Sequence, residues 1–212
     1  FQNKFSNLKK IISSSINPKA IIFDLGLSSF QLSDSKRGFS FKSNGPLNMK
    51  MGFNDYSAYD VVNTLDKEQL SKIIKILGDE KDSKKIASRI VKYRTKRKIK
   101  TSEELTNIIN EVKKNYNKNN KHPATKIFQA IRIFINKELT ELIKGLTAAT
   151  ELLNEGGILI VISFHSLEDK IVKSFFNEYS NSNKNPSRYL PLDNKKIDLF
   201  KILSKKPLIP DK

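Results

Sequence analysis

The sequence contains no cysteine and no tryptophan, and its only two histidines, His122 and His165, lie far apart. Without cysteine there can be no disulfide framework, thiolate metal site or cysteine nucleophile. Two distant histidines do not make a dedicated zinc site, so we expect no metal centre. No apolar run approaches the ~18 residues that a membrane span needs, and no signal peptide is seen. These absences favour a soluble protein of the reducing cytoplasm, with no membrane partner.

Acidic residues are also in short supply. The 212 residues include 39 Lys and Arg but only 22 Asp and Glu, which gives a formal net charge of +17. Most of the basic residues are Lys, and a biased genome composition could produce that excess without any selection for a polyanion. The distribution is more informative, because residues 81–100 hold ten basic residues and one acid, and residues 113–126 hold five basic residues and none. This clustering favours nucleic-acid binding.

The first part of the chain reads as a helix followed by a short strand. Apolar spacing predicts a helix over residues 7–14, and the apolar run at 20–23 predicts a buried strand that ends at Asp24. Residues 26–52 are rich in Gly, Ser and Asn without a sustained period, and we interpret them as a long loop. Long loops inside compact domains are usually functional.

The middle of the chain is predicted to be helical. Asp66 with Gln69, and Thr101 with Glu104, have the spacing of capping boxes that open two helices, the second with an apolar stripe that continues to Tyr116. Between them, Lys85, Arg89, Lys92 and Lys96 fall on one helical face that has no acid in its sequence neighbourhood. We expect this basic stripe to contact RNA phosphates, although an ordinary solvated face is the alternative.

The last part returns to a helix–strand–helix pattern. Residues 122–153 carry the period of one long helix, with His122 most simply explained as a structural residue at its start. The β-branched run at 158–164 predicts a strand buried on both faces of a parallel sheet. Ser166 with Asp169 predicts the cap of a further helix, and residues 180–188 a flexible connection. The whole layout indicates an α/β fold with a helical subdomain within it.

Two polar clusters follow the two predicted strands. Asp24 comes at the end of the first, and Ser163 and His165 at the end of the second. In open parallel sheets ligands bind beyond these strand ends, so we expect a site there. Asp24 could contact a ligand or cap a turn, and His165 could belong to the site or cap the following helix.

Several motifs in the same order resemble the RsmH (MraW) family of bacterial methyltransferases, which modify the exocyclic N4 of a cytidine in the small-subunit (16S) ribosomal RNA. They are FDLGLSSFQL at 23–32, RGFSF at 37–41, GPLNMKM at 45–51, HPATK at 122–126 and ISFHSLEDKIVK at 162–173. The resemblance covers nearly the whole chain.

The resemblance implies a class I methyltransferase fold, a Rossmann-like sheet that binds S-adenosyl-L-methionine, with an inserted all-helical domain that recognises the substrate. We accordingly assign residues 1–50 and 125–212 to the methyltransferase domain and residues 51–124 to the insert. Carried over from the family's motifs, Phe5, Asp24 and Gln31 contact the cofactor. Ser163, His165 and Ser28 are candidates for orienting the cytosine amino group. The partner is small-subunit ribosomal RNA or the ribosomal subunit.

One departure from the family pattern bears on activity. In the family, the first strand and the Gly-rich cofactor loop lie upstream of a Phe-Ser-x-Leu motif, which corresponds to residues 5–8 here, and only four residues precede Phe5. We therefore expect an N-terminally truncated chain that binds RNA weakly and shows almost no methyl transfer. The alternative function is a non-catalytic RNA-binding or ribosome-assembly module that has lost its cofactor loop.

Overall fold

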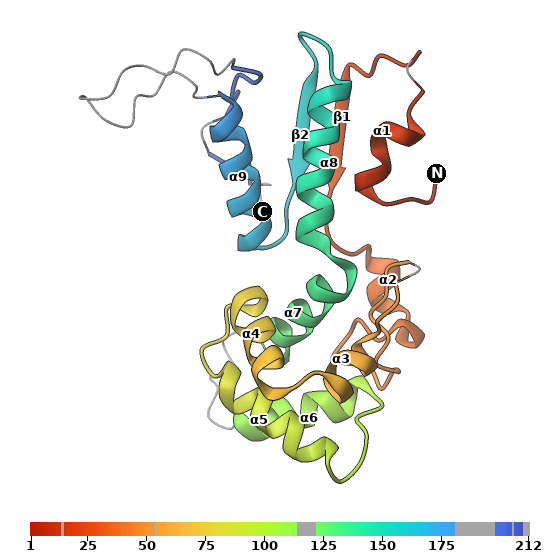
Figure 1. Cartoon of the computed structure of the whole chain (residues 1–212), viewed down its shortest axis with the longest axis vertical. Helices are drawn as coiled ribbons and strands as arrows, with labels where there is room; N and C mark the ends of the chain where they lie inside the picture. Colours follow the sequence, from red (N-terminus) through yellow and green to blue (C-terminus); the bar gives the residue numbers. More distant parts are fainter. Residues whose placement is uncertain (14, 53, 114–121, 181–197, 205, 210–212) are drawn as a thin grey trace, which may run out of the picture. The chain divides into compact units, whose positions relative to one another are not determined.

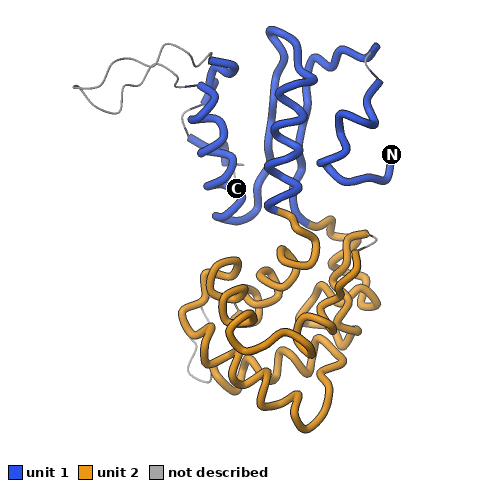
Figure 2. Tube along the Cα trace, in the orientation of Figure 1, with its two compact units in different colours: residues 1–26, 139–212 blue, residues 27–138 orange. Residues whose placement is uncertain are grey.

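The computed structural model describes the chain except for residues 14, 53, 114–121, 181–197, 205 and 210–212. The chain forms two compact units, coloured separately in Figure 2: unit 1 comprises residues 1–26 and 139–212, and unit 2 comprises residues 27–138. The divisions thus lie at 26/27 and 138/139, whereas the sequence placed them at 50/51 and 124/125. Segments 27–50 and 125–138 join unit 2 because their buried residues Leu47, Met49, Ile127 and Ile131 belong to its core.

Unit 1 is built on two parallel strands, as the sequence predicted. β1 (Ala20–Asp24) pairs with β2 (Ile158–Ile162) in a register that runs from Ala20 opposite Ile158 to Asp24 opposite Ile162. The other elements of unit 1 are η1 (Phe5–Asn7), α1 (Leu8–Ile11), α8 (Glu138–Leu152) and α9 (Ser166–Ser180). Figure 1 shows α8 running along the strand pair. The predicted N-terminal helix is therefore shorter than expected, a single 3-10 turn followed by one helical turn.

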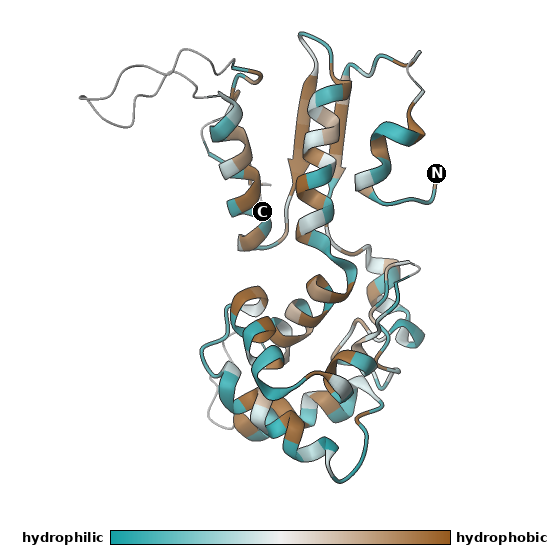
Figure 3. Ribbon diagram, in the orientation of Figure 1, coloured by the Kyte–Doolittle hydropathy of each residue, from teal (hydrophilic) through white to brown (hydrophobic). Residues whose placement is uncertain are grey.

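The core of unit 1 lies on one face of its sheet. Phe23 and Leu25 of the β1 segment pack with Leu142, Leu146 and Phe175 from α8 and α9. Each fully buried side chain of this size contributes roughly 1.5–3 kcal/mol. The prediction that the second strand is buried on both faces was wrong. The residues that alternate with the core positions are exposed by 43–61 %: Ile22, Ile158, Ile160 and Ile162. Figure 3 shows the apolar colour of both strands.

Unit 2 is helical in the part of it that the structure describes. Its elements are α2 (Ser29–Ser33), η2 (Ser35–Arg37), α3 (Ala58–Thr64), α4 (Lys67–Gly78), α5 (Ser83–Arg94), α6 (Ser102–Val112) and α7 (Ala124–Asn136). Both predicted capping boxes are present, Asp66 with Gln69 at α4 and Thr101 with Glu104 at α6. The helices pack around fully buried aliphatic side chains, among them Leu70, Ile74, Ile86, Ile90, Ile108, Ile109, Ile127 and Ile131.

The predicted long loop at 26–52 is more ordered than expected. It contains α2 and η2, and its residues Phe39, Leu47 and Met49 are buried in the core of unit 2. The amide of buried Asn136 holds this segment in place. Its Oδ1 accepts from the Met51 N–H at 2.7 Å, and its Nδ2 donates to the Met49 carbonyl at 2.9 Å. The Asn136 side chain, 85 positions away from Met51, thus fixes a loop whose own sequence has no helical or strand periodicity.

The predicted single helix over residues 122–153 is two helices. α7 ends at Asn136, Lys137 takes a left-handed conformation with φ 52°, and α8 begins at Glu138. Arg132 clamps the turn, because its Nε and Nη2 donate to the two carboxylate oxygens of Glu138, both at 2.8 Å. Periodicity could not reveal the break, since both helices carry apolar faces. The predicted stripe of α6 is described up to Val112, whereas its last residue, Tyr116, and residues 181–188 of the predicted connection lie outside the described residues. No helix in the described part of the chain is long and apolar enough to cross a membrane.

Candidate functional site

The two polar clusters predicted at the strand ends lie at the same edge of one sheet. Asp24 is the register partner of Ile162, the residue before Ser163, and the Leu25 N–H donates to the Ile162 carbonyl at 3.1 Å. Asp24 is exposed, and its carboxylate has no hydrogen bond or ion pair within the described residues. The turn-capping alternative for Asp24 is therefore not what the structure shows. This edge of the sheet presents a carboxylate to solvent.

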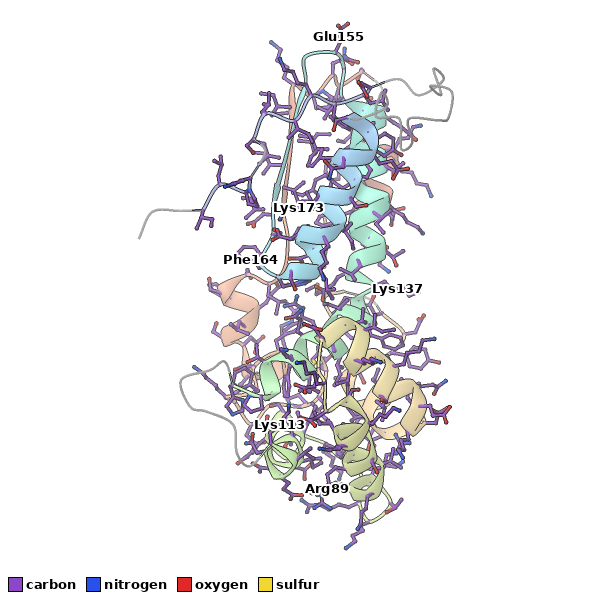
Figure 4. All side chains as sticks on the ribbon, turned by 90° about the vertical axis from the view of Figure 1, so that its left-hand side faces the viewer. Arg89, Lys113, Lys137, Glu155, Phe164 and Lys173 are labelled. Atoms are coloured by element: carbon purple, nitrogen blue, oxygen red, sulfur yellow. The ribbon has the colours of Figure 1, made fainter. Side chains whose placement is uncertain are left out.

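Gly26 and Phe164 pack together just beyond these strand ends. Gly26 has φ +86°, and a Cβ added to it would lie 3.3 Å from Cδ2 of the Phe164 ring. Only glycine can adopt this positive φ and lie this close to the Phe164 ring without strain. Phe164, labelled in Figure 4, remains 67 % exposed. The strand end thus carries an exposed aromatic ring beside the segment that bears Asp24.

Ser163 and His165 are both tied to the beginning of α9. The Ser163 hydroxyl donates to Asp169 Oδ1 at 2.5 Å. The Phe164 and His165 N–H groups donate to Glu168 Oε2 at 2.9 and 3.3 Å, and the Glu168 N–H donates to His165 Nδ1 at 3.4 Å. His165 and Glu168 therefore form a reciprocal cap. The cap predicted at Ser166 lies one residue earlier, and of the two interpretations of His165 the capping one is realised.

Phe5 packs beside β1 in unit 1. Its ring meets the ring of Phe23 edge to face, with centroids 5.1 Å apart at 84°. A Cβ at Gly145 of α8 would lie 2.8 Å from the Phe5 Cβ, so the glycine makes room for this contact. The Ser6 N–H donates to Glu141 Oε2 at 3.0 Å and anchors the turn. The structure thus brings Phe5 to the strand that ends at Asp24.

Ser28 and Gln31 belong to unit 2, where they cap α2 together. The Gln31 N–H donates to Ser28 Oγ at 3.2 Å, and the Ser28 N–H donates to Gln31 Oε1 at 3.0 Å. The carbonyl of the Gln31 side chain is therefore engaged locally, and the amide nitrogen is the part of it that can donate to a ligand. The Ser-x-x-Gln spacing is a capping-box signal that could have revealed α2 in the sequence.

The predicted basic stripe lies partly on α5. Its residues Lys85, Arg89 and Lys92 line an open surface depression together with Lys67, Lys84, Ser88 and Val112. Arg89 is labelled in Figure 4. Lys96 lies beyond the end of α5 at Arg94 and does not line the depression. Lys67 and Lys84 line the depression but were not part of the predicted stripe. Lys67 could not be found from the helical spacing of that stripe, because it comes from α4.

Acidic side chains reach this surface from two places, Asp82 directly before α5 and Glu111 on α6, and the local sequence of the stripe did not reveal the second. The Arg89 Nε donates to Glu111 Oε2 of α6 at 2.5 Å, and Lys85 Nζ lies 3.2 Å from Asp82 Oδ1. Asp82 also accepts from Lys113 Nζ at 2.7 Å. Hydrogen bonds from Lys113 and then Lys85 lower the pKa of Asp82. Although residues 84–100 hold no acid, two of the four cations of the stripe are therefore paired with carboxylates.

Lys113 joins the ends of two segments of unit 2. Its Nζ donates to the buried Glu80 at 2.7 Å as well as to Asp82. Burial on its own would lower the pKa of Lys113, but the hydrogen bonds to Asp82 and Glu80 and the charges of both acids outweigh it and raise that pKa. The ammonium group of Lys113 therefore stabilises the fold of unit 2 through these two ion pairs and is not a candidate for binding a ligand.

Comparison with known proteins gives the family. The profile of the MraW methylase family matches residues 1–212. Three relatives, each named ribosomal RNA small subunit methyltransferase H, show the degree of similarity. The one from Ehrlichia canis is 47 % identical over 179 residues, which cover 83 % of this chain and 60 % of the relative. Those from Afipia carboxidovorans and Oenococcus oeni are 42 % and 45 % identical, over 99 % of this chain and 63 % and 67 % of the relatives.

The chain therefore spans about 60 % of the length of the first of these curated relatives. The match extends over the strand-end residues Asp24 and Ser163 and over both units. A profile match over the whole chain and identities above 40 % lead to one conclusion. The chain belongs to the MraW methylase family.

Proposed function

We propose that this chain carries out the transfer of a methyl group from S-adenosyl-L-methionine to the exocyclic N4 of a cytidine in small-subunit (16S) ribosomal RNA. Membership of the MraW methylase family and the shared name of its relatives support this. With it we propose a class I methyltransferase fold for the strand-bearing part and a substrate-recognition role for the helical part. The observation that carries the proposal is the position of Asp24 beside the Ser163 segment at one edge of a parallel sheet.

The groups at this edge suit the cofactor's chemistry. S-adenosyl-L-methionine supplies an electrophilic methyl group when bound, and it offers hydroxyl and amino donors besides. Asp24 is an exposed carboxylate that can accept from such donors, and a charge-assisted hydrogen bond contributes roughly 1.5–3 kcal/mol. Phe5 of unit 1 would add an apolar contact. Gln31 of unit 2 stays a prediction from the family's motif, and its side-chain amide nitrogen is the group that could donate to the cofactor.

The residues proposed to act on the RNA base need to orient an amino group rather than to attack. Ser163 Oγ donates its proton to Asp169, so its lone pairs remain able to accept an amino proton. His165 Nδ1 is used by the helix cap, and Ser28 Oγ accepts from the Gln31 N–H. Of the three, Ser163 has the hydroxyl oxygen that is most able to accept a hydrogen bond from the cytosine amino group. Such an acceptor orients the amino nitrogen and favours the attack of that nitrogen on the methyl group.

Methyl transfer to RNA tests the proposal directly. The chain is incubated with methyl-labelled cofactor and small ribosomal subunits, and the RNA is digested to nucleosides. The small amount of label that this chain transfers should appear in N4-methylcytidine, and Asp24→Asn should reduce it about tenfold or more, which corresponds to a loss of about 1.4 kcal/mol or more. Lys173→Ala, an exposed position on α9, serves as the control.

Two results would speak against the proposal. Label on another nucleoside, or label that Asp24→Asn leaves unchanged, would contradict the assigned chemistry. Binding of RNA without any methyl transfer would favour the alternative, a non-catalytic RNA-binding module.

A further inference from the structure

Five basic side chains from two helices converge on one surface depression of unit 2. Ser88 and Val112 complete its lining, and the five cations are Lys67, Lys84, Lys85, Arg89 and Lys92. The lysines are all exposed, whereas the adjacent positions Ile86 and Ile90 on α5 are fully buried. Replacement of these lysines should therefore not disturb the core. The depression is a cationic surface fixed on a packed helical scaffold.

The five cations are not equivalent. Lys85 is paired with Asp82, and Arg89 with Glu111. Lys67, Lys84 and Lys92 make no ion pair with any residue that the structure describes. Lys67, Lys84 and Lys92 can therefore bind anions from solution, whereas the guanidinium of Arg89 is already bound to the carboxylate of Glu111.

The Arg89–Glu111 pair has the chemistry of an exchangeable contact. The side chains of Arg89 and Glu111 are 37 % and 45 % exposed, and ion pairs in such surroundings contribute only about 0–1 kcal/mol. The N–H groups of a guanidinium can donate to the oxygens of a carboxylate or of a phosphate in the same geometry. A phosphate held by the neighbouring lysines could therefore displace Glu111 at little cost.

We propose that this depression binds the phosphate backbone of RNA through Lys67, Lys84 and Lys92, and that Glu111 occupies Arg89 in place of a phosphate until RNA binds. The inference rests on the proposed function, because RNA is the polyanion that the function requires. Cations spread over two helices around an open surface suit the repeated phosphates of a nucleic-acid strand better than one small anion. Glu111 then limits the affinity of the chain for RNA.

The first test separates this surface from general attraction by the net charge of +17. Binding of a fluorescent RNA fragment from the small subunit is measured by anisotropy at several salt concentrations. We expect the variant with Lys67, Lys84 and Lys92 all changed to Ala to lower the log–log salt slope by about two, at ~0.7 per phosphate contact. The control changes Lys144, Lys170 and Lys173 of unit 1 to Ala, which removes the same charge and should lower the slope much less.

The second test addresses Glu111. Glu111→Gln removes the charge but keeps the shape, so we expect tighter RNA binding and a slope steeper by about 0.7. In the Arg89→Ala background the same change should have little effect, because there is no guanidinium to release. A gain of equal size in both backgrounds would show that Glu111 merely repels RNA, and would overturn its role as a stand-in for phosphate.

The remaining outcomes also decide the matter. Equal slopes for the two triple variants, absence of RNA binding by the chain, or equally tight binding of polyglutamate would overturn the RNA surface. None of these measurements uses methyl transfer. Failure here therefore leaves the proposed activity to its own test, and a chain that binds RNA through the depression but never methylates would refute only that activity.

Discussion

The ring of Phe164 lies against Gly26 at the edge of the sheet in unit 1, where a Cβ on Gly26 would come 3.3 Å from the ring. Gly26 also has φ +86°, a conformation that side chains disfavour. We expect Gly26→Ala to lower the free energy of unfolding by about 1–3 kcal/mol, measured by urea denaturation.

Two other glycines provide matched controls. Gly156 has φ +81° with no neighbour within 4 Å, so Gly156→Ala carries the backbone strain without the ring contact. Gly52 has neither feature, and Gly52→Ala should be neutral or stabilising by up to about 1 kcal/mol. If Gly26→Ala were only as destabilising as Gly156→Ala, the packing against Phe164 would contribute nothing to the stability of unit 1.

Asp24→Asn should weaken cofactor binding far more than Ser28→Ala does. A carboxylate makes charge-assisted hydrogen bonds of roughly 1.5–3 kcal/mol, whereas a neutral hydroxyl contributes about 1 kcal/mol. Ser28 is moreover committed to the cap of α2. Calorimetric titration of the chain with S-adenosyl-L-methionine measures both losses. Equal affinities for Asp24→Asn and the unaltered chain would remove Asp24 from the proposed site.

The sequence predicted those parts of the fold that follow from local pattern. Capping boxes at Asp66 and Thr101 located two helices, and the β-branched run after Gly157 located β2. The break at Lys137 was missed because its causes are not periodic. Arg132 reaches Glu138, and Asn136 reaches a loop far away in the sequence.

The site was predicted to a similar extent. That Asp24 and Ser163 lie at the same edge of one sheet follows from two parallel strands, and the pairing of Asp24 with Ile162 confirms it. The partners of the basic stripe could not be predicted, because Glu111 comes from another helix and only packing brings it to Arg89. The exposed face of β2 was missed for a related reason, since a run of apolar residues does not tell which faces are covered.

Asn136→Ala should destabilise the chain strongly. Its buried side-chain amide accepts hydrogen bonds from the Met51 N–H and the Asn54 side chain and donates one to the Met49 carbonyl. Each buried polar group left without a partner costs about 1–3 kcal/mol. We expect a loss of about 2–4 kcal/mol in chemical denaturation. Asn110→Ala is the control, because the buried Oδ1 of Asn110 has no hydrogen bond within the described residues. Comparable losses for the two variants would contradict the role of Asn136.

The stability of α3 should depend on pH through Asp60. The hydroxyl and then the N–H of Ser57 donate to its carboxylate and hold the pKa of Asp60 below its ordinary value of 3.8. A lowered folded-state pKa stabilises the fold fully above 3.8, and this contribution is lost as the pH falls through the folded-state pKa. Asp60→Asn should therefore be less stable by about 0.5–2 kcal/mol near neutral pH.

The pH range in which this difference disappears is the test. Denaturation of the unaltered chain and of Asp60→Asn should give stability curves that converge as the pH falls below 3.8. In a Ser57→Ala background the difference should be smaller at every pH, because the donor hydroxyl is gone. A difference in stability between the unaltered chain and Asp60→Asn that persists into acid would show that the carboxylate charge is not what caps α3.

Lys92 and Lys96 should differ in their contribution to RNA binding, although helical spacing places both on the predicted stripe. Lys92 lies within α5 and lines the depression, whereas Lys96 follows the end of the helix at Arg94 and does not line it. Lys92→Ala should lower the salt slope by ~0.7, the value for one phosphate contact on a single strand, and Lys96→Ala by much less. Both variants lose one charge, so their net charge is the same. Anisotropy titrations measure both effects. If Lys96→Ala weakened binding as much as Lys92→Ala, the result would favour the continuous stripe that the sequence alone predicted. The RNA would then lie along the helix axis rather than over the depression.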